Sequence, residues 1–340
     1  MVKIPEPHNT ISNFIDAAHE ARANKPRHHM GISILGGPCE RAMWLSFRWA
    51  VQEKFLGRIL RLFRRGHQEE ANIISDLRAA GLDVKTLNGK QERVHFGAHV
   101  SGSIDAIITA GVPEAPKKHH IAEFKTHSLK SFTDLEKRGV QLSKPQHYAQ
   151  MQGYMLGMKI DRALYVAVCK DNDKIYTERV RLDKTFAEKL IEKGRRLALA
   201  DRLPPPISTD PSWYQCKFCP AHEFCHVTQT TQHVNCRTCA HSTAMEDSTW
   251  RCELHDANDI PVEFQHEGCP SHVLHPDLVP WKRKPDTWTY IIDGKEFPNG
   301  APDETTYTSK EILNFRDVII SNEDFIKSVR ETFPGAEIVK

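Results

Sequence analysis

The sequence predicts an α/β fold in which a mixed sheet is flanked by helices, and three observations lead to this prediction. Apolar residues recur at helical spacing in three long stretches, which are residues 40–80, 146–158 and 183–203. Between them lie short β-branched runs typical of strands, at residues 93–100, 103–109 and 120–126. A strand pair is expected at residues 163–168 and 174–182, around the turn Asp171-Asn172-Asp173. When helices and strands alternate in this way, the strands are expected to form one sheet and the helices to cover its faces.

The helical stretches carry their own boundary signals. Residues 40–80 are expected to break near Gly57 and Gly66, and Gly81 follows as a C-terminal cap. The last helical stretch is amphipathic and stops before Pro204, because proline cannot continue a helix.

Two carboxylates lie inside apolar, strand-like runs. Asp105 precedes Ala-Ile-Ile, and Glu123 stands between Ala122 and Phe124, two positions before Lys125 on the same strand face. The alternative is a solvated strand face, but carboxylates seldom enter such runs unless they are paired or bind a metal. Carboxylate oxygens can bind Mg²⁺ or Mn²⁺, and the lysine beside them can hold a phosphate or a water. This combination suits metal-assisted hydrolysis of a phosphodiester.

A glutamine and a tyrosine follow one turn apart on the helix expected at 146–158. Asp105, Glu123-x-Lys125 and Gln150-x-x-x-Tyr154 together resemble the PD-(D/E)XK nuclease superfamily, in its RecB-like and lambda-exonuclease-like branch. The resemblance covers residues 30–226 and is of a phage type. It implies a restriction-endonuclease-like core and DNA as the substrate.

The resemblance also implies roles for these residues. The ligands of Mg²⁺ or Mn²⁺ would be Asp105, Glu123, the Phe124 carbonyl and Glu70. Lys125 would orient the attacking water, and Gln150 and Tyr154 would position Lys125 or the scissile phosphate. Gln146 and His147, one turn earlier, are secondary candidates for this role.

The helix-borne ligand has three candidates. Glu70 stands four residues after Gly66, the offset common in this branch, and Glu69 and His67 are close rivals. The related proteins often use histidine at this place, so the choice among the three stays open.

Basic and aromatic side chains alternate between residues 41 and 65. The arginines expected to contact DNA are Arg61, Arg64 and Arg65, which lead into Gly66. The alternative for these arginines is the solvated face of an amphipathic helix, whereas Trp44, Phe47 and Phe63 are expected in the core.

The nine cysteines are not placed like a secreted disulfide framework. The N-terminus lacks the apolar region of a signal peptide, and no run of about 18 apolar residues exists. We therefore expect a cytoplasmic protein of a bacterial or phage-infected cell, with no membrane segment. The formal net charge of +2 neither favours nor excludes a nucleic-acid partner.

One cysteine cluster has three members close together, and a fourth stands far upstream. These residues are Cys216, Cys219, Cys225 and Cys39. One cysteine before the nuclease core and three after it resemble the iron–sulfur RecB-like nucleases, including the AddB and CRISPR-associated types. This implies a 4Fe–4S cluster, with zinc as the alternative that four thiolates also suit. Cys169 is instead expected as an ordinary buried thiol.

A second cluster predicts a structural zinc site. Its ligands are Cys236, Cys239, Cys252 and Cys269, with His241 and His255 as substitutes. A segment with so few periodic apolar positions needs a metal to fold. The resulting module, residues 231–280, would either position DNA through basic side chains such as Arg237 and Arg251 or cover the nuclease core.

The expected organisation has three parts. Residues 1–230 form the nuclease domain, 231–280 the zinc module, and 281–340 a polar tail with one helix at 309–322. The expected function is a metal-dependent DNA exonuclease in recombination, repair or phage DNA metabolism. The alternatives are a catalytically weak DNA-binding or structural protein with zinc sites, and a zinc-dependent nucleic-acid-binding regulator. Oligomeric state, strand preference and cleavage polarity stay open.

Overall fold

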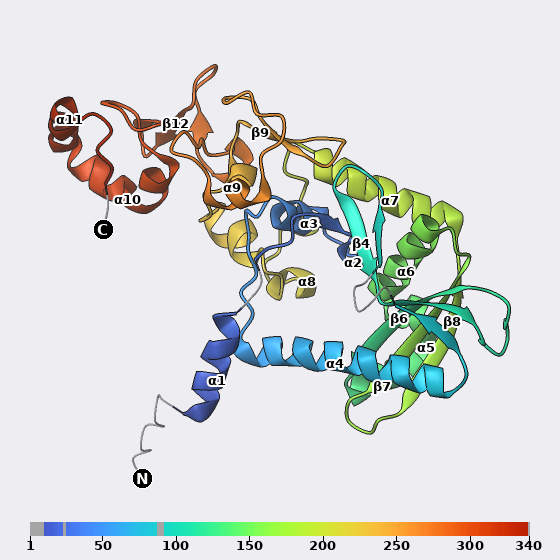
Figure 1. The fold of residues 1–340 in the computed structure, drawn as a ribbon. Coiled ribbons are helices and arrows are strands. Elements are labelled where there is room, and N and C mark those ends of the chain that lie inside the picture. The colour runs from blue at the N-terminus through green and yellow to red at the C-terminus, as the bar shows by residue number, and fades with distance from the viewer. Residues whose placement is uncertain (1–9, 23–24, 87–91, 339–340) are drawn as a thin grey trace, which may run out of the picture.

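The computed structural model describes residues 10–22, 25–86 and 92–338, and it contains a mixed five-stranded sheet at the end of the molecule away from the C-terminal elements (Figure 1). The strand order is β2-β5-β6-β7-β8, and only β6 and β7 run parallel. The strands are β2 (Asp83–Lys85), β5 (Ala106–Ala110), β6 (His120–His127), β7 (Arg162–Cys169) and β8 (Ile175–Arg181). The mixed sheet flanked by helices confirms the expected fold class.

Helices cover both faces of this sheet. One face packs against α4 (Gly57–Ala79), through Ile73 and alternate strand residues such as Phe124. The other face packs against α5 (Leu129–Ser143) and α6 (Pro145–Met158), together with α7 (Lys184–Leu199). Because side chains alternate along a strand, Glu123, Lys125 and His127 share the face that looks toward α5 and α6.

A smaller sheet stands beside the first, in the order β1-β4-β3. Its strands are β1 (Met30–Gly31), β3 (Glu92–His95) and β4 (Val100–Ile104), and α2 (Ile32–Leu35) follows β1. Asp105 is the single residue between β4 and β5. The chain therefore leaves one sheet and enters the other at the predicted catalytic aspartate.

Three sequence-based boundaries need correction. The strand expected at 103–109 is divided between β4 and β5 at Asp105. The helix α4 runs without a break through Gly66, since one glycine costs a 23-residue helix only about 1 kcal/mol. The strand expected at 93–100 is divided into β3 and β4 by a turn, in which Gly97, Ala98 and His99 all have positive φ. The break expected near Gly57 is confirmed, because α3 ends at Phe47 and α4 begins at Gly57.

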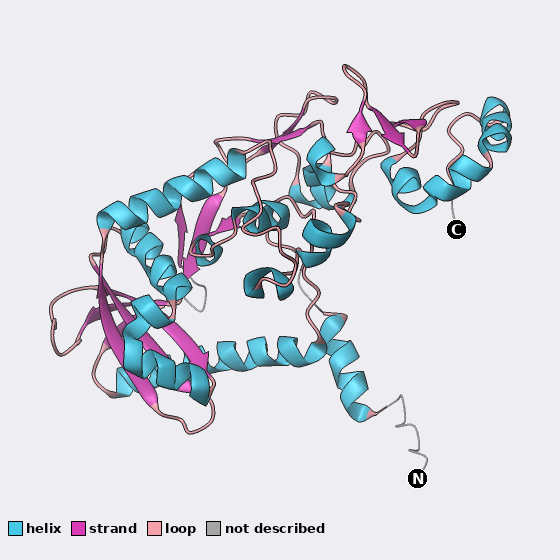
Figure 2. Ribbon diagram, turned by 180° about the vertical axis from the view of Figure 1, so that it is seen from behind, coloured by secondary structure: helices cyan, strands magenta, loops and turns pink. Residues whose placement is uncertain are grey.

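The cysteines other than Cys169 lie on or next to short elements around the helix α3 (Glu40–Phe47). These elements are α8 (Tyr214–Lys217), η1 (Phe224–Thr228), η2 (Cys236–Thr238), β9 (Ser242–Ala244), β10 (Trp250–Cys252), α9 (Val262–Glu267) and η3 (Pro276–Leu278). Figure 2 shows that they occupy the middle of the molecule, between the five-stranded sheet and the C-terminal elements.

The C-terminal part is more ordered than the predicted polar tail. It contains a three-stranded sheet and two helices, which are β11 (Lys282–Arg283), β12 (Thr289–Ile292), β13 (Lys295–Pro298), α10 (Ser309–Ser321) and α11 (Glu323–Thr332). Tyr290, Phe297 and Ile312 form its buried core, which the widely spaced apolar residues of this segment did not reveal. The predicted helix at 309–322 is present as α10.

At the other end of the chain, α1 (Ile11–Glu20) packs against α4. None of the described helices has the length and apolar character needed to cross a bilayer.

Candidate functional site

The site begins at the junction between the two sheets. Asp105 places its Oδ2 atom 2.9 Å from the backbone N–H of Phe124, which donates a hydrogen bond to it. This bond joins the start of β5 to the middle of β6. Burial raises the pKa of Asp105, against the opposing effect of Lys125. Cross-strand pairing of β5 with β6 thus brings together residues that are 18 positions apart in the chain.

Glu123 and Lys125 form a buried pair on β6. The Lys125 ammonium contacts Oε1 of Glu123 and donates to the Phe124 carbonyl at 3.2 Å. Burial raises the pKa of Glu123 to about 8, and Asp105 adds to the effect. Burial alone would lower the pKa of Lys125, but Glu123 and Asp105 outweigh it and raise that pKa. Lys125 is therefore held in its charged form.

The second oxygen of Glu123 has no partner. Oε2 is fully buried and makes no hydrogen bond with the described residues. A buried, partnerless carboxylate oxygen is costly, and a bound cation would satisfy it. With Asp105 and the Phe124 carbonyl it makes an all-oxygen donor set that suits Mg²⁺ or Mn²⁺. Among the described residues, no group of three or more His, Cys, Asp or Glu side chains is arranged to hold a metal ion.

Glu70 approaches this set from α4. Burial raises its pKa and the nearby Asp105 carboxylate raises it further. His67, one turn earlier, lies 3.5 Å from Glu70 through its Nδ1 atom. Glu69 instead accepts a hydrogen bond from Asn72 at 3.4 Å. Of the three candidates from the sequence, Glu70 is the one whose charge interacts with both Asp105 and Glu123.

Gln150 and Tyr154 are both buried on α6. Gln150 donates from Nε2 to the Tyr154 hydroxyl at 3.1 Å. Burial and the Glu123 carboxylate raise the pKa of Tyr154, so its hydroxyl stays protonated. Gly102 leaves the space for this tyrosine, because a Cβ atom there would lie 2.7 Å from its ring.

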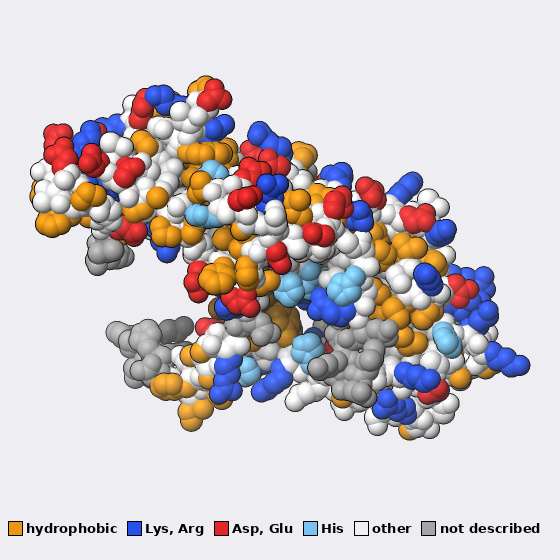
Figure 3. All heavy atoms as spheres, turned by 45° about the horizontal axis from the view of Figure 1, so that its top comes forward, with side chains coloured by type: hydrophobic (Ala, Val, Ile, Leu, Met, Phe, Trp, Pro, Cys, Tyr) orange, Lys and Arg blue, Asp and Glu red, His pale blue; other side chains and the backbone are white. Residues whose placement is uncertain are grey.

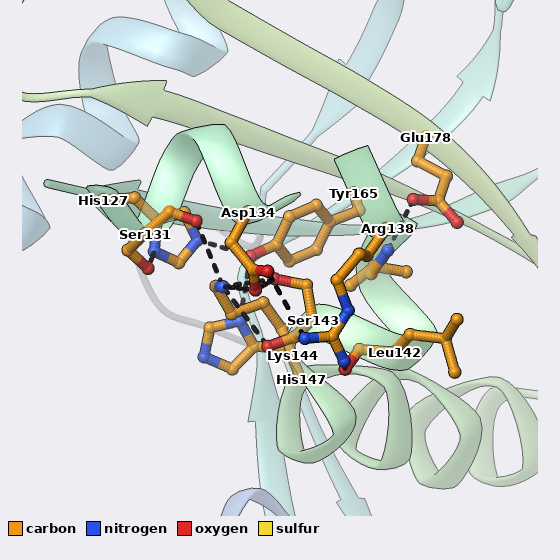
Figure 4. Close-up of polar contacts among 11 residues, drawn as sticks. His127, Ser131, Asp134, Arg138, Leu142, Ser143, Lys144, His147, Tyr165 and Glu178 are labelled. Atoms are coloured by element: carbon orange, nitrogen blue, oxygen red, sulfur yellow. Dashed lines mark hydrogen bonds and ion pairs between the residues drawn. The ribbon is translucent and has the colours of Figure 1, made fainter. Parts of the chain in front are cut away.

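A second polar cluster lies beside the site, and of its members the sequence pattern had indicated only His147, as a secondary candidate. Tyr165 on β7 lies opposite Glu123, and its hydroxyl is 2.9 Å from Nε2 of His127 and 2.9 Å from Nδ1 of His147 (Figure 4). The available signal was His127 itself, which follows Lys125 by two positions and so shares its face of β6.

The three predicted DNA-binding arginines differ in what they contact. Arg61 forms an ion pair with Asp16 of α1. Arg64 and Arg65 are exposed on α4, and Arg65 donates to the Lys170 carbonyl at 3.3 Å. Arg61 is thus engaged within the protein, whereas Arg64 lies open on the surface.

The fold brings the first four cysteines close to one another. Burial raises the pKa values of Cys216, Cys219 and Cys225, and the Cys39 thiol raises each of them further. Arg41 and Trp44 of α3 donate to the carbonyls of Pro204 and Ala200, at 2.7 and 2.8 Å. These bonds hold the segment after α7 against α3. Cys169 is buried at the end of β7, as expected of an unreactive thiol.

The second cysteine set also converges. Burial raises the pKa of Cys236 to about 12, and the thiols of Cys239, Cys269 and Cys252 add to this effect. Val273 N–H points at Cys239 Sγ at 3.5 Å, and Cys269 Sγ lies 3.6 Å from Nε2 of His255.

The predicted role of Arg237 in DNA binding is wrong, because this side chain is buried. It donates to Gln265 at 2.9 Å and to the carbonyls of Phe47 and His28 at 3.0 Å each. Its guanidinium lies 3.8 Å from the ring centre of Trp49. It therefore fixes the cysteine-rich segment to α3 and cannot reach a phosphate backbone.

Comparison with known proteins gives one extended match. Residues 8–226 match the family model described as the PD-(D/E)XK nuclease superfamily. No curated protein matches the chain.

Several solved structures are similar to this chain at low identity. The structure of SSO0001 is 16% identical, covers 64% of this chain and 96% of its own, and has a TM-score of 0.39. The alkaline exonuclease LHK-Exo of Laribacter hongkongensis, solved with dAMP, is 14% identical over 54% of this chain and 89% of its own, with a TM-score of 0.37. A phage-related exonuclease of Haemophilus somnus 129PT is 19% identical over 40% of this chain and 68% of its own, with a TM-score of 0.30.

Proposed function

We propose that this chain, which belongs to the PD-(D/E)XK nuclease superfamily, is a divalent-metal-dependent deoxyribonuclease that acts as an exonuclease. The observation that carries the proposal is the buried Glu123, which pairs with Lys125 through one oxygen and has no hydrogen-bond partner on the other among the described residues. Carboxylates with strongly shifted pKa values cluster at catalytic sites. In a purely structural ion pair, both carboxylate oxygens would be expected to have hydrogen-bond partners.

Each residue has a distinct task in this proposal. Asp105, Glu123 and the Phe124 carbonyl would hold Mg²⁺ or Mn²⁺, with Glu70 as a further ligand. Such an ion, when bound, neutralises charge on the phosphate and lowers the pKa of bound water. Lys125, whose positive charge is stabilised by Glu123 and Asp105, would hold the attacking water or a phosphate oxygen.

Gln150 and Tyr154 would act as positioning groups. Their hydrogen bond fixes the tyrosine hydroxyl near Glu123, and Gly102 allows the close approach. The hydroxyl stays protonated and therefore donates a hydrogen bond without adding negative charge.

The proposed substrate is DNA, and α4 supplies the exposed cations that would contact its backbone. Arg64 and Arg65 stand within two turns of Glu70 on the same helix. Figure 3 shows further Lys and Arg side chains on the part of the molecule that contains the five-stranded sheet. Exposed cations near the site would bind phosphates irrespective of base sequence.

The test is a cleavage assay on linear and closed circular DNA of the same sequence, with Mg²⁺, Mn²⁺ or EDTA. We expect degradation of linear DNA with either metal, none with EDTA, and survival of the closed circle. Asp105→Asn and Lys125→Met should each lower the rate by at least about 10³-fold, since residues that act as a unit fail together.

The matched control is Asp173→Asn, which changes an exposed aspartate in the β7–β8 turn. Cleavage by Lys125→Met at the wild-type rate would contradict the proposed site. Cleavage of the closed circle would exclude an exonuclease, and metal-dependent DNA binding without cleavage would favour the weakly catalytic alternative.

We also propose that both cysteine sets bind metals. Cys39, Cys216, Cys219 and Cys225 would hold a 4Fe–4S cluster, and Cys236, Cys239, Cys252 and Cys269 would hold zinc. Anaerobically purified protein should contain iron and sulfide in similar amounts, plus one zinc ion. Cys216→Ser should lose the iron and keep the zinc, and Cys252→Ser should do the reverse. Protein with zinc in both sites would identify the first site as a zinc site.

A further inference from the structure

The reaction proposed above releases a proton from the attacking water, and Lys125 cannot accept it. Its ammonium is held in the charged form by Glu123 and Asp105. The carboxylates of Asp105 and Glu123 are committed as metal ligands in the proposed site. The proton must pass to another group or to solvent, and the second polar cluster lies beside Lys125: His127 shares its face of β6, and the Lys125 charge acts on both His127 and His147.

The cluster is a continuous chain of hydrogen bonds, which we call the file. It runs from His147 on α6 through the Tyr165 hydroxyl on β7 to His127 on β6, with both links at 2.9 Å. It continues from Nδ1 of His127 to the Ser131 hydroxyl at 3.3 Å, on α5 (Figure 4). Tyr165 and His127 are buried, whereas His147 and Ser131 at the two ends are partly exposed. The file thus connects the neighbourhood of Lys125 with the outer helix α5.

The two histidines are neutral near pH 7. Burial and the positive charges of Lys125 and Lys144 lower the pKa of His147 to about 3. Burial, Lys144, Lys125 and Lys170 lower that of His127 to about 4. Each ring is therefore neutral and has one donor and one acceptor nitrogen, as a relay requires. Burial, Glu123 and Glu178 raise the pKa of Tyr165, so it keeps its proton to pass on.

The end of the file is held in place by a separate network. Lys144 donates to the Ser131 carbonyl at 3.2 Å and to the Ser143 hydroxyl at 2.5 Å, and Ser143 donates to Asp134 at 2.5 Å. This network fixes the junction of α5 and α6, three residues before His147 (Figure 4). Nε2 of His147 makes no hydrogen bond with the described residues and is the open end of the file.

We propose that His147, Tyr165 and His127 form a proton relay for the hydrolysis, an inference that rests on the proposed function. As the water oxygen bonds to phosphorus and the leaving oxygen departs, Nε2 of His147 takes the water proton. The Nδ1 proton of His147 moves to the Tyr165 oxygen, the Tyr165 proton moves to Nε2 of His127, and the Nδ1 proton of His127 leaves past Ser131 to solvent. The departing oxygen takes one proton from solvent, so the charges balance.

The first test compares two tyrosine variants on adjacent strands. Tyr165→Phe interrupts the file, whereas Tyr176→Phe removes a hydroxyl that bonds to Glu178 at 2.6 Å and lies outside it. We expect Tyr165→Phe to lower kcat by about 10²-fold with KM for DNA unchanged, as general-base steps of this kind contribute. Tyr176→Phe should cleave at the wild-type rate.

Proton-specific measurements separate a relay from a purely structural role. Rates in H₂O and D₂O mixtures should indicate several protons in transit for the wild type and fewer for Tyr165→Phe. Imidazole should restore part of the activity of His147→Ala and none of that of Lys125→Met. In metal-free protein, nitrogen NMR should find the proton on Nδ1 of both His127 and His147.

The outcomes distinguish this inference from the proposed function. No cleavage by the wild type with Mg²⁺ or Mn²⁺ would overturn both. Cleavage by the wild type together with an unimpaired Tyr165→Phe would overturn the relay alone. So would a slow Tyr165→Phe with an unchanged isotope effect and no imidazole rescue, or a proton on Nε2 of His127.

Discussion

The five-stranded sheet and the cysteine-rich segment both bury charged side chains, but they satisfy them differently. On β6, Lys125 contacts one oxygen of Glu123, and the other oxygen has no hydrogen-bond partner among the described residues. In the cysteine-rich segment, Arg237 donates to Gln265 and to two backbone carbonyls and lies over the Trp49 ring. A buried charge that lacks hydrogen-bond partners has a perturbed pKa and is typical of a functional site. A buried charge whose hydrogen bonds are all made fixes the packing of its neighbours. The first region is accordingly the candidate site and the second a support.

The largest expected effect tests the supporting role of Arg237. Arg237→Met should lower the free energy of unfolding by about 3–5 kcal/mol, because three acceptors, two of them buried, lose their donor. Arg251→Met, which changes an exposed arginine near Asp256, should alter it by less than about 0.5 kcal/mol. Chemical denaturation of both variants gives the comparison. A small effect at Arg237 would remove the contrast between the two regions.

The next prediction concerns the pH dependence that Glu123 imposes. Its folded-state pKa of about 8 is raised, so the folded protein binds a proton that the unfolded chain has already lost above about pH 4.5. The free energy of unfolding, measured without Mg²⁺ or Mn²⁺, should therefore fall as pH rises from 5 to 8.

The matched variant isolates this contribution. Glu123→Gln should reduce the pH dependence by about 2–4 kcal/mol, since each pKa unit corresponds to about 1.4 kcal/mol. Equal slopes for the two proteins over this pH range would show that Glu123 is not buried in the manner described.

A third prediction sharpens the idea that the site depends on close packing. Gly102→Ala should push the Tyr154 ring aside, because the new Cβ would lie 2.7 Å from it. We expect a roughly tenfold loss in kcat/KM, since small displacements of positioning groups are costly. Gly66→Ala is the control, because its Cβ would meet nothing within 4 Å. A fully active Gly102→Ala would show that Tyr154 has no positioning role.

The smallest effect extends the comparison to surface arginines. Arg64→Ala should weaken DNA binding a few-fold and lower the slope of log affinity against log salt by about one. Arg61→Ala should leave that slope unchanged, because its charge is already paired with Asp16. Binding titrations at several salt concentrations measure both variants. A change of slope for Arg61 alone would reverse the assignment.

The sequence predicted the core of the site because its signals are local. Glu123-x-Lys125 and Gln150-x-x-x-Tyr154 each lie on one element, and the apolar neighbours of Asp105 and Glu123 already indicated burial. Tyr165 was missed because its part in the cluster depends on the parallel register of β6 and β7, which places it opposite Glu123. No pattern within β7 distinguishes it from an ordinary core tyrosine.

The long-range contacts account for the other differences. Arg237 reads as a basic residue beside a cysteine pair, and only the packing of α3 against this segment shows that it is buried. The C-terminal sheet was missed for a similar reason, since its strands are short and separated by polar turns. Local patterns predicted α7 well because it is amphipathic, and α6 was predicted to within one residue of its observed bounds although it is buried on most sides.

The turn between β3 and β4 determines where this chain can be shortened. The N–H groups of Ala98 and His99 donate to the Glu246 carbonyl at 2.7 Å and to the Ser248 hydroxyl at 2.8 Å, and β4 leads from this turn to Asp105. The family match ends at residue 226, before these acceptors. A chain cut there would keep every proposed catalytic residue but would lose the acceptors of this turn and uncover Phe47 and Trp49. We therefore expect that a chain ending where the family match ends would not fold independently.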